Sequence, residues 1–166
     1  ATSFAETLGA EVYQQTVPYG AHYFSEHVCF MGTLSRDQQD VRRILEQFDL
    51  MIVLGADVLR MSVWSEVDPM PDEISVIQLG LVDWEMGKNY STEQAIYGDL
   101  RETLKVMTPL LRQRGGEALQ QSSNIAIAEY KTRNWNFNRK KLRGVIDSLP
   151  PRKPMSPDLF TLRVVE

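Results

Sequence analysis

The sequence is poor in cysteine, histidine and long apolar runs, and each shortage excludes a class of protein. Cys29 is the single cysteine, so an internal disulfide framework is excluded and a reducing cytoplasm is the expected compartment. No apolar run approaches the ~20 residues that cross a bilayer, and the N-terminal residues lack the charged and apolar segments of a signal peptide. We therefore expect a cytoplasmic protein without a membrane-spanning segment.

Motifs that bind phosphate or a metal ion, or that carry a reactive serine, are also missing. No two of the 10 glycines are separated by a single residue, which excludes the dinucleotide fingerprint and leaves no phosphate-binding loop. His22, His27 and Cys29 lie near one another, but their spacing does not fit a zinc site, so we predict ordinary hydrogen bonds and no metal there. Both histidines share one short segment and no serine elbow is present, so nothing local indicates nucleophilic catalysis.

The composition is that of one ordinary globular domain. The chain has 166 residues, of which 43% are hydrophobic, and its net charge is −4. Basic residues cluster around Trp135 and Phe137, a combination that can bind single-stranded nucleic acid. The acidic balance of the whole chain and the amphipathic helix that follows favour a solvated or domain-facing surface instead. We predict no nucleic-acid partner.

Strand and helix patterns alternate over residues 1–114. Buried strands are predicted at 50–54 and 74–81, shorter strands at 11–16 and 95–97, and helices at 2–8, 35–48 and 99–111. The strand at 50–54 is apolar at every position, which is typical of a parallel sheet covered by helices on both faces. The predicted fold class is α/β: a Rossmann-like, three-layer parallel sheet flanked by helices, joined by right-handed crossovers.

Two capping signals and one proline set the expected helix ends. Ser35 with Gln38 forms the pattern of a capping box, and Asp99 is expected to cap the helix that carries Glu102. Pro109 is expected to kink or shorten the last turn of that helix.

From Gly115 onward, the alternation of strand and helix patterns gives way to helical patterns alone. Helical patterns at 117–131 and 139–149 flank a break at 134–136, and the proline-rich segment 150–154 is expected to be a stiff connector before a last helix that begins at Ser156. We interpret 1–114 as an N-terminally truncated α/β domain, 115–155 as a helical interdomain strap, and 156–166 as the start of a further domain. Because the chain opens on Ala1 and stops within an apolar run, we expect it to be a piece of a larger enzyme.

Small residues at the strand ends mark the candidate site. Ligands of open parallel sheets lie beyond the carboxyl ends of the strands, and here those ends are 55–57 and 80–83. Glycine at such a position allows close approach by another backbone or by a ligand. For each of these two strand ends, two interpretations remain open: tight packing against another backbone, or a loop that faces a ligand.

Several ordered segments resemble one family. Residues 19–32 carry the spaced Gly, aromatic, His and Gly of the loop after an early strand in the central domain of thiamine-diphosphate-dependent enzymes, the group that includes acetolactate synthase, pyruvate oxidase and benzoylformate decarboxylase. Residues 49–56 resemble the family's "aDlvlvlGa" strand, and 77–89 resemble the stretch written IDIDPAEIGKN in acetolactate synthase. Gly98-Asp99 matches the "GD" before the last central helix, and 154–166 resembles the lead-in to the diphosphate-binding domain.

The resemblance implies which parts of the enzyme lie elsewhere. Thiamine diphosphate and Mg²⁺ are held in this family by the pyrimidine-binding and diphosphate-binding domains, so the parent enzyme would use both while this fragment would bind neither. In the flavin-containing members, acidic residues near the end of the IDID strand accompany FAD. The corresponding positions here are Gly80 and Val82, which puts flavin binding in doubt. The implied partners are the missing domains of the same chain, in a homo-oligomeric enzyme.

The resemblance also supplies site candidates. In benzoylformate decarboxylase the loop after the "GA" strand provides an active-site histidine in a stretch like G-A-x-V-x-R-x-H. Our chain matches this framework at Gly55, Ala56, Val58 and Arg60, with Ser62 at the histidine position. A serine cannot titrate near neutral pH as an imidazole does, so a different substrate or proton relay is implied. Ser62 is thus a pocket-lining candidate, and Gly55, Ala56, Asp57 and Arg60 are candidates for cofactor contact.

The function expected from these features is the central scaffold domain of a thiamine-diphosphate-dependent 2-oxo acid decarboxylase or carboligase, inactive as an isolated fragment. An independent FAD- or ADP-binding module of the same fold is the alternative. A third possibility is a structural domain that binds nothing and joins its neighbours into an oligomer.

Overall fold

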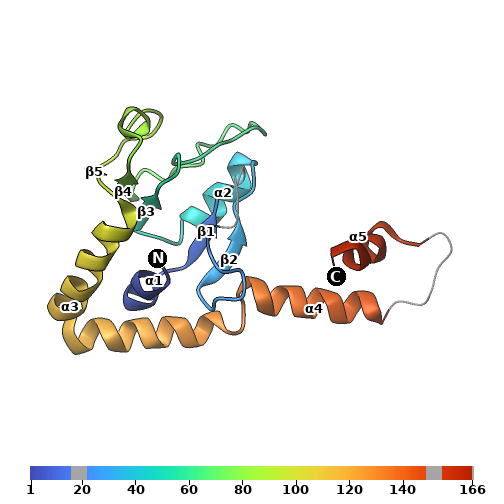
Figure 1. Ribbon diagram of the computed structural model, residues 1–166. Coiled ribbons are helices and arrows are strands. Elements are labelled where there is room, and N and C mark those ends of the chain that lie inside the picture. Colours follow the sequence, from blue (N-terminus) through green and yellow to red (C-terminus); the bar gives the residue numbers. More distant parts are fainter. Residues whose placement is uncertain (16–21, 149–154, 166) are drawn as a thin grey trace.

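The computed structural model describes residues 1–15, 22–148 and 155–165, and it forms an α/β body from which a helical arm extends (Figure 1). The elements follow one another as α1 (Thr2–Leu8), β1 (Val12–Gln14), β2 (Phe30–Thr33), α2 (Gln38–Leu45), β3 (Leu50–Leu54), β4 (Ser75–Gly80), η1 (Asp83–Glu85), β5 (Gln94–Tyr97), α3 (Leu100–Tyr130), α4 (Trp135–Asp147) and α5 (Pro157–Val165). The strand predicted at 11–16 is thus shorter, and its last residue lies outside the described part.

The strands are parallel throughout the described residues. β1 pairs with β2, and β3, β4 and β5 form a three-stranded sheet in that order. Parallel pairing requires each chain crossover to return along a sheet face, and this places helices over the sheet. The predicted fold class, a parallel sheet flanked by helices with a helical C-terminal extension, is confirmed.

Two hydrophobic clusters make the layers on either side of β3, β4 and β5. On one face, Leu79 of β4 is 3% exposed and packs with Phe4 of α1 and Leu104 of α3. On the other face, Val41 and Leu45 of α2 form a cluster that Met51 of β3 joins. The expected apolar stripe of α2 and the expected buried face of α3 are both confirmed by these clusters.

The expected capping box was wrong, although the other predicted cap is present. Asp37, not Ser35, is the N-cap of α2, because its carboxylate accepts hydrogen bonds from the backbone N–H of Gln39 at 2.8 Å and of Asp40 at 3.2 Å. Ser35 instead accepts from the backbone N–H of Asp37 and supports the turn before the helix. Asp99 caps α3 as predicted and accepts from the backbone N–H of Glu102.

The bend in α3 was also predicted at the wrong residue. The helix continues through Pro109 and breaks at Gly116, whose φ of 54° and ψ of −148° lie outside the helical region. That combination is open to glycine and strongly disfavoured for other residues. The helix therefore spans the predicted boundary at residue 114, and the proposed domain limits stay predictions.

Of the two C-terminal helices, α4 starts earlier than predicted, whereas α5 starts where it was predicted, after Ser156. Asn134 lies in the expected break, but it caps a helix that begins at Trp135, four residues earlier than expected, by accepting from the backbone N–H of Phe137. α5 begins at Pro157, a favoured first-turn position for proline. The stiff connector predicted at 150–154 lies outside the described residues. None of the helices in the described part combines the length and the hydropathy that a bilayer crossing needs.

Candidate functional site

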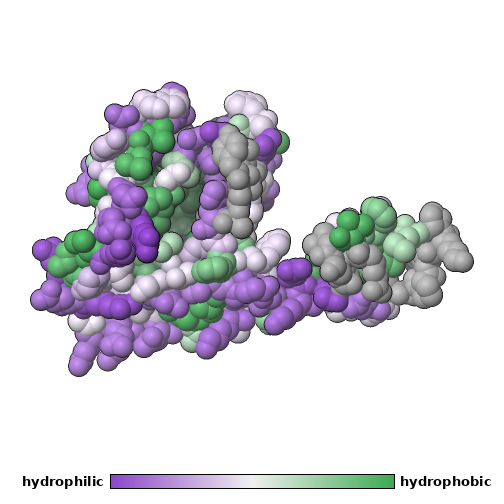
Figure 2. Space-filling model, in the orientation of Figure 1, coloured by the Kyte–Doolittle hydropathy of each residue, from purple (hydrophilic) through white to green (hydrophobic). Residues whose placement is uncertain are grey.

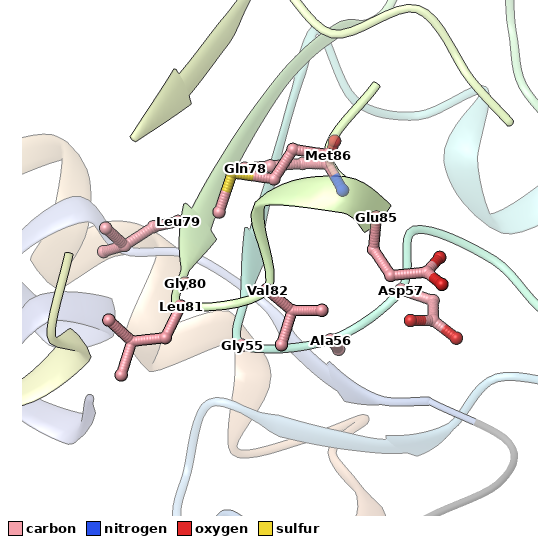
Figure 3. Close-up of a pocket in the computed structure, with 10 residues that line it drawn as sticks. All are labelled: Gly55, Ala56, Asp57, Gln78, Leu79, Gly80, Leu81, Val82, Glu85 and Met86. Atoms are coloured by element: carbon pink, nitrogen blue, oxygen red, sulfur yellow. The ribbon is translucent and has the colours of Figure 1, made fainter. Parts of the chain in front are cut away.

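A pocket lies at the carboxyl ends of β3 and β4 (Figure 3). Its floor and walls come from the two segments that the sequence marked, the strand ends and the turns that follow them. The lining residues are Gly55, Ala56, Asp57, Gln78, Leu79, Gly80, Leu81, Val82, Glu85 and Met86. The structure therefore brings three of the sequence-based candidates, Gly55, Ala56 and Asp57, to one place.

Two glycines lie at the base of the pocket, Gly55 next to Leu100 and Gly80 next to Gly55. Gly55 has a φ of 65°, and a Cβ at this position would lie 2.7 Å from Cδ1 of Leu100. A Cβ on Gly80 would lie 3.5 Å from Cα of Gly55. The positive φ of Gly55 favours glycine, whereas the 3.5 Å distance at Gly80 is an ordinary van der Waals contact, and both glycines line the pocket.

The loop after β4 is anchored by a glutamine in the strand itself. Gln78 is 2% exposed, and its Oε1 accepts a hydrogen bond from the backbone N–H of Gly87 at 2.6 Å and from Thr92 Oγ1 at 2.7 Å. These contacts hold the turn that contains η1 over the strand end. Sequence reasoning missed this residue. The available signal was a polar amide within the otherwise apolar strand 76–79.

The rim of the pocket carries two carboxylates, each paired with a cation. Asp57 Oδ2 forms an ion pair with Arg60, and Glu85 Oε1 lies 3.1 Å from Lys88 Nζ. Lys88 Nζ also lies 4.5 Å from the ring centroid of Trp84, a cation–π geometry. Arg60 is thus directed to Asp57, and the charge at the rim is balanced.

Ser62 is placed on the same loop but away from this pocket's lining. Its backbone N–H donates to the carbonyl of Arg36, and Val63 forms a parallel bridge with Asp37. The loop then continues with Val63, 50% exposed, and Trp64, 76% exposed. The side chain of Ser62 is exposed, so this loop presents polar and apolar groups to whatever packs beside it.

The histidine and cysteine segment is tied together by hydrogen bonds. His27 Nε2 lies 3.1 Å from Glu6 Oε1, and His27 Nδ1 accepts from the backbone N–H of Cys29 at 3.2 Å. Cys29 is fully buried, and burial raises the pKa of its thiol to about 11, with a smaller contribution from Glu6. Across the described ranges, no three His, Cys, Asp or Glu side chains group in a way that could hold a metal ion.

The basic stretch around Trp135 is partly neutralised by acidic neighbours. Arg133 Nη2 lies 2.5 Å from Glu11 Oε1, and Arg133 Nε lies 2.9 Å from Glu129 Oε1. Arg139 lies 3.9 Å from Glu26. The hydrogen bond that Arg133 donates to the carboxylate of Glu11 is the main reason that the pKa of Arg133 is raised.

Large apolar side chains are exposed near the same end of the sheet. Leu81, Trp84 and Tyr97 are between 57% and 67% exposed, and all three follow or end a strand of the three-stranded sheet. Figure 2 shows apolar surface among polar groups in the part of the molecule that carries β3, β4 and β5. The carboxyl edge of the sheet therefore combines a polar pocket with apolar surroundings.

Comparison with known proteins decides the family. The sequence model described as "Thiamine pyrophosphate enzyme, central domain" matches residues 1–107, which cover α1 to the first turns of α3. The chain belongs to this family. The matched residues include the two clusters on either side of β3, β4 and β5, apart from Leu111, and the pocket at the carboxyl ends of β3 and β4.

The fold of this central domain is also similar to that of a solved structure. It matches the X-ray structure described as "a putative thiamin diphosphate-dependent enzyme isolated from Mycobacterium smegmatis" with a TM-score of 0.60 and 24% sequence identity. The match covers 65% of this chain and 21% of that chain, so the present chain spans about a fifth of the neighbour's length. A search of curated proteins gives no match.

The family implies a thiamine diphosphate cofactor, but the pocket does not fit its diphosphate and metal. The described residues offer no metal-binding cluster, and the pocket rim carries carboxylates rather than unpaired cations. A diphosphate with its Mg²⁺ needs oxygen ligands to the metal and positive charge around the phosphates. We therefore assign no step of a reaction to the cofactor at this site.

Proposed function

We propose that this chain is the scaffold domain of a thiamine-diphosphate-dependent 2-oxo acid decarboxylase or carboligase similar to benzoylformate decarboxylase. The observation that supports it is the ordered match over residues 1–107, combined with a loop at 58–64 that leaves the carboxyl end of β3. In such enzymes the cofactor supplies the carbanion chemistry, and the protein positions it and excludes competing reactions. The chain alone is expected to be inactive.

The proposed role of the chain's own residues is to shape the surroundings of a substrate. Ser62 would lie near the substrate in the assembled enzyme, on a loop that Arg36 and Asp37 hold by backbone contacts. Gly55, Ala56, Asp57 and Arg60 would form the turn from which this loop starts. The ion pair between Arg60 and Asp57 supports a positioning role for both, because it ties the two ends of that turn together.

The proposed partners follow from the exposed apolar groups and from the length of the similar enzyme. Trp64, Trp84 and Tyr97 are suited to pack against neighbouring domains, because large aromatic groups dominate the cores of interfaces. We propose the pyrimidine-binding and diphosphate-binding domains of the same chain as these neighbours, within a homo-oligomer located in the cytoplasm.

The coding sequence that flanks residues 1–166 tests the class of the parent enzyme. We expect a GDG…N motif roughly 30 to 60 residues beyond Glu166, because that motif supplies oxygen ligands to the Mg²⁺ of the bound diphosphate. An open reading frame that continues without such a motif would contradict the assignment to a thiamine-dependent parent.

The Ser62→Ala change in the full-length enzyme tests the role of the loop. We expect the ratio of kcat/KM values between two 2-oxo acids to change by roughly tenfold, because loss of one polar contact discriminates between substrates on this scale. The affinity for thiamine diphosphate should stay the same. Ser122→Ala is the matched control, since Ser122 is exposed on α3 and its hydroxyl donates only to the carbonyl of Leu119. An equal loss for every 2-oxo acid would contradict the proposed role.

A further inference from the structure

The segment before β4 forms an acidic surface, which we call the acidic loop (residues 66–73). It contains four acidic side chains and no basic one, and all four are exposed: Glu66, Asp68, Asp72 and Glu73. Val67, between the first two, is 40% exposed. Among the described residues, no lysine or arginine forms an ion pair with any of these four carboxylates. Their charge is therefore left to solvent or to another molecule.

Helix α2 holds the acidic loop in one conformation. Arg42 Nη1 donates to the backbone carbonyls of Met70 at 3.0 Å and of Asp68 at 3.3 Å. Its Nε donates to Glu46 at 2.8 Å, so the ion pair of this arginine is made within α2 and not with the loop carboxylates. The two prolines of the loop are buried. A surface that is ordered before it binds loses little conformational entropy on association.

Helix α4 carries the opposite charge. Its 13 residues include four basic side chains and one acidic side chain. Arg139 and Arg143 each have an acidic neighbour, at 3.9 Å and 3.8 Å. Lys140 and Lys141 are exposed and form no ion pair with any described residue. Two cations of α4 are therefore available to an acidic partner.

Exposed apolar side chains lie beside these lysines. Phe137, Lys141 and Val145 follow one another at intervals of four residues, so they share one face of α4. Leu142, three residues before Val145, adjoins this face. The three apolar side chains are between 43% and 59% exposed. A helix face that combines exposed apolar groups with cations is suited to contact with an acidic protein surface.

The acidic loop and α4 of one chain do not meet. Figure 1 shows α4 leaving the lower part of the body beyond β2, whereas the segment that joins β3 to β4 extends from the upper part. No ion pair within the described part of the chain joins the two. A nucleic acid or an anionic lipid surface would match the lysines of α4 but would be repelled by the acidic loop. A second copy of the chain matches both surfaces at once.

We propose that two copies of this chain dock reciprocally, with α4 of each copy against the acidic loop of the other. Lys140 and Lys141 pair with the loop carboxylates, and the apolar face of α4 covers Val67. The contact occurs twice about a two-fold axis, the commonest symmetry of protein dimers. This inference goes beyond the proposed function and does not depend on the reaction of the parent enzyme.

Sedimentation equilibrium of the 166-residue chain tests the proposal through ionic strength. In ~20 mM salt, where charges act over tens of ångströms, we expect the mean molar mass to rise toward that of two chains as the protein concentration increases. In ~500 mM salt the Debye length falls to about 4 Å, so the dissociation constant of the dimer should increase at least tenfold. A monomer at every concentration, or a dimer that does not respond to salt, would overturn the proposal.

Charge reversal identifies the two surfaces. Lys140→Glu with Lys141→Glu reverses the helix, and Glu66→Lys with Asp72→Lys reverses the loop. Each double variant alone should dimerise at least about tenfold more weakly, because like charges then face one another. An equimolar mixture of the two should recover the dimer, because the reversed helix meets the reversed loop and the unmodified helix meets the unmodified loop. A mixture that stays monomeric would contradict the reciprocal contact.

Arg101→Glu with Arg114→Glu is the matched control. It makes the same change in net charge as the helix variant, at exposed positions of α3, and should dimerise as the unmodified chain does. Equal weakening in the control would mean that net charge alone governs association and would overturn the proposal. Binding of a monomeric chain to vesicles that contain anionic lipid would also overturn it, since α4 would then meet a lipid surface. If a double variant does not fold, Lys141→Ala should still weaken the dimer severalfold.

Discussion

Gly9 meets two independent requirements at a single position. It ends α1 with a φ of 62° and a ψ of 35°, the left-handed conformation that satisfies the last carbonyls of a helix. It also lies against α3, where an added Cβ would come within 2.7 Å of Cα of Ser123. The first requirement is local to the end of α1, whereas the second depends on a contact between residues more than 100 positions apart.

Gly9→Ala is therefore expected to be more damaging than a helix-end substitution alone. The left-handed conformation costs ~1–2 kcal/mol for a residue with a Cβ, and relief of the backbone contact should bring the total above ~2 kcal/mol. Gly144→Ala is the control, because a Cβ there meets nothing within 4 Å and alanine favours the helix interior by ~1 kcal/mol. Urea unfolding measures the change in the free energy of unfolding for each of the two variants. Equal stability changes for the two variants would contradict the proposed contact.

The second test at the residue scale is the pH dependence that Cys29 gives to the free energy of unfolding. Its pKa is raised from 9.0 to about 11 by burial, so the folded state keeps the thiol protonated while the unfolded state ionises. The unfolded state then binds fewer protons, and the free energy of unfolding falls as pH rises from about 9 to about 11. The contribution is present in full below pH 9, and its loss should reach at most ~2–3 kcal/mol.

The comparison of unmodified chain and Cys29→Ala in urea at pH 8 and pH 10 measures this contribution. Burial also raises the pKa of Tyr23, so part of the alkaline loss will remain in the variant. We expect the variant to lose less stability than the unmodified chain between the two pH values. An identical loss would show that the thiol does not contribute.

At the scale of elements, α3 wraps around α1. The helix bends at Gly116, and α1 lies within the angle (Figure 1). Arg112, before the bend, donates to the hydroxyls of Ser3 and Thr7. Tyr130, after the bend, donates its hydroxyl hydrogen bond to the carbonyl of Gly9 at 2.6 Å. Both arms of α3 thus hold the same short helix.

Tyr130→Phe tests this clamp without changing the volume of the core. Tyr130 is 6% exposed, so loss of its hydroxyl should cost ~1–2 kcal/mol and leave the Gly9 carbonyl with one partner fewer. Faster hydrogen exchange of the α1 amides should accompany the loss. Tyr97→Phe is the control, since Tyr97 is 67% exposed and should change stability by less than ~0.5 kcal/mol. A uniform increase in exchange over all elements would contradict a local clamp.

Elements were more predictable from the sequence than the details that position them. The apolar run at 50–54 and the stripe of α2 depend on local periodicity, and both appear where expected. The predicted cap of α2 and the predicted bend of α3 were wrong because, in each case, a second residue nearby in the sequence could take the same role. Asp37 displaced Ser35, and the backbone freedom of Gly116 outweighed the missing N–H of Pro109. Gln78 was missed because its partners, Gly87 and Thr92, are defined only by the folded loop.

At the scale of the whole molecule, several surface features meet at one edge of the sheet. The carboxyl edge of the sheet gathers the pocket, the loop with Ser62 and several exposed apolar side chains. The described residues provide no metal-binding cluster at that edge or elsewhere among them. The family could be read from the order of its sequence motifs, and the match covers 21% of the similar solved chain.

The charge balance of the pocket rim predicts how the chain responds to the family's cofactor. A ligand that binds only the folded state at 100 times its Kd raises the free energy of unfolding by ~2.7 kcal/mol, which a thermal melt detects readily. We expect thiamine diphosphate with Mg²⁺ to leave the Tm of the 166-residue chain unchanged and to raise that of the full-length enzyme. Omission of Mg²⁺ is the control, because metal-dependent diphosphate binding should vanish without it. A Mg²⁺-dependent rise in the short chain would mean that a diphosphate site is formed within residues 1–166, against the charge balance of the pocket rim.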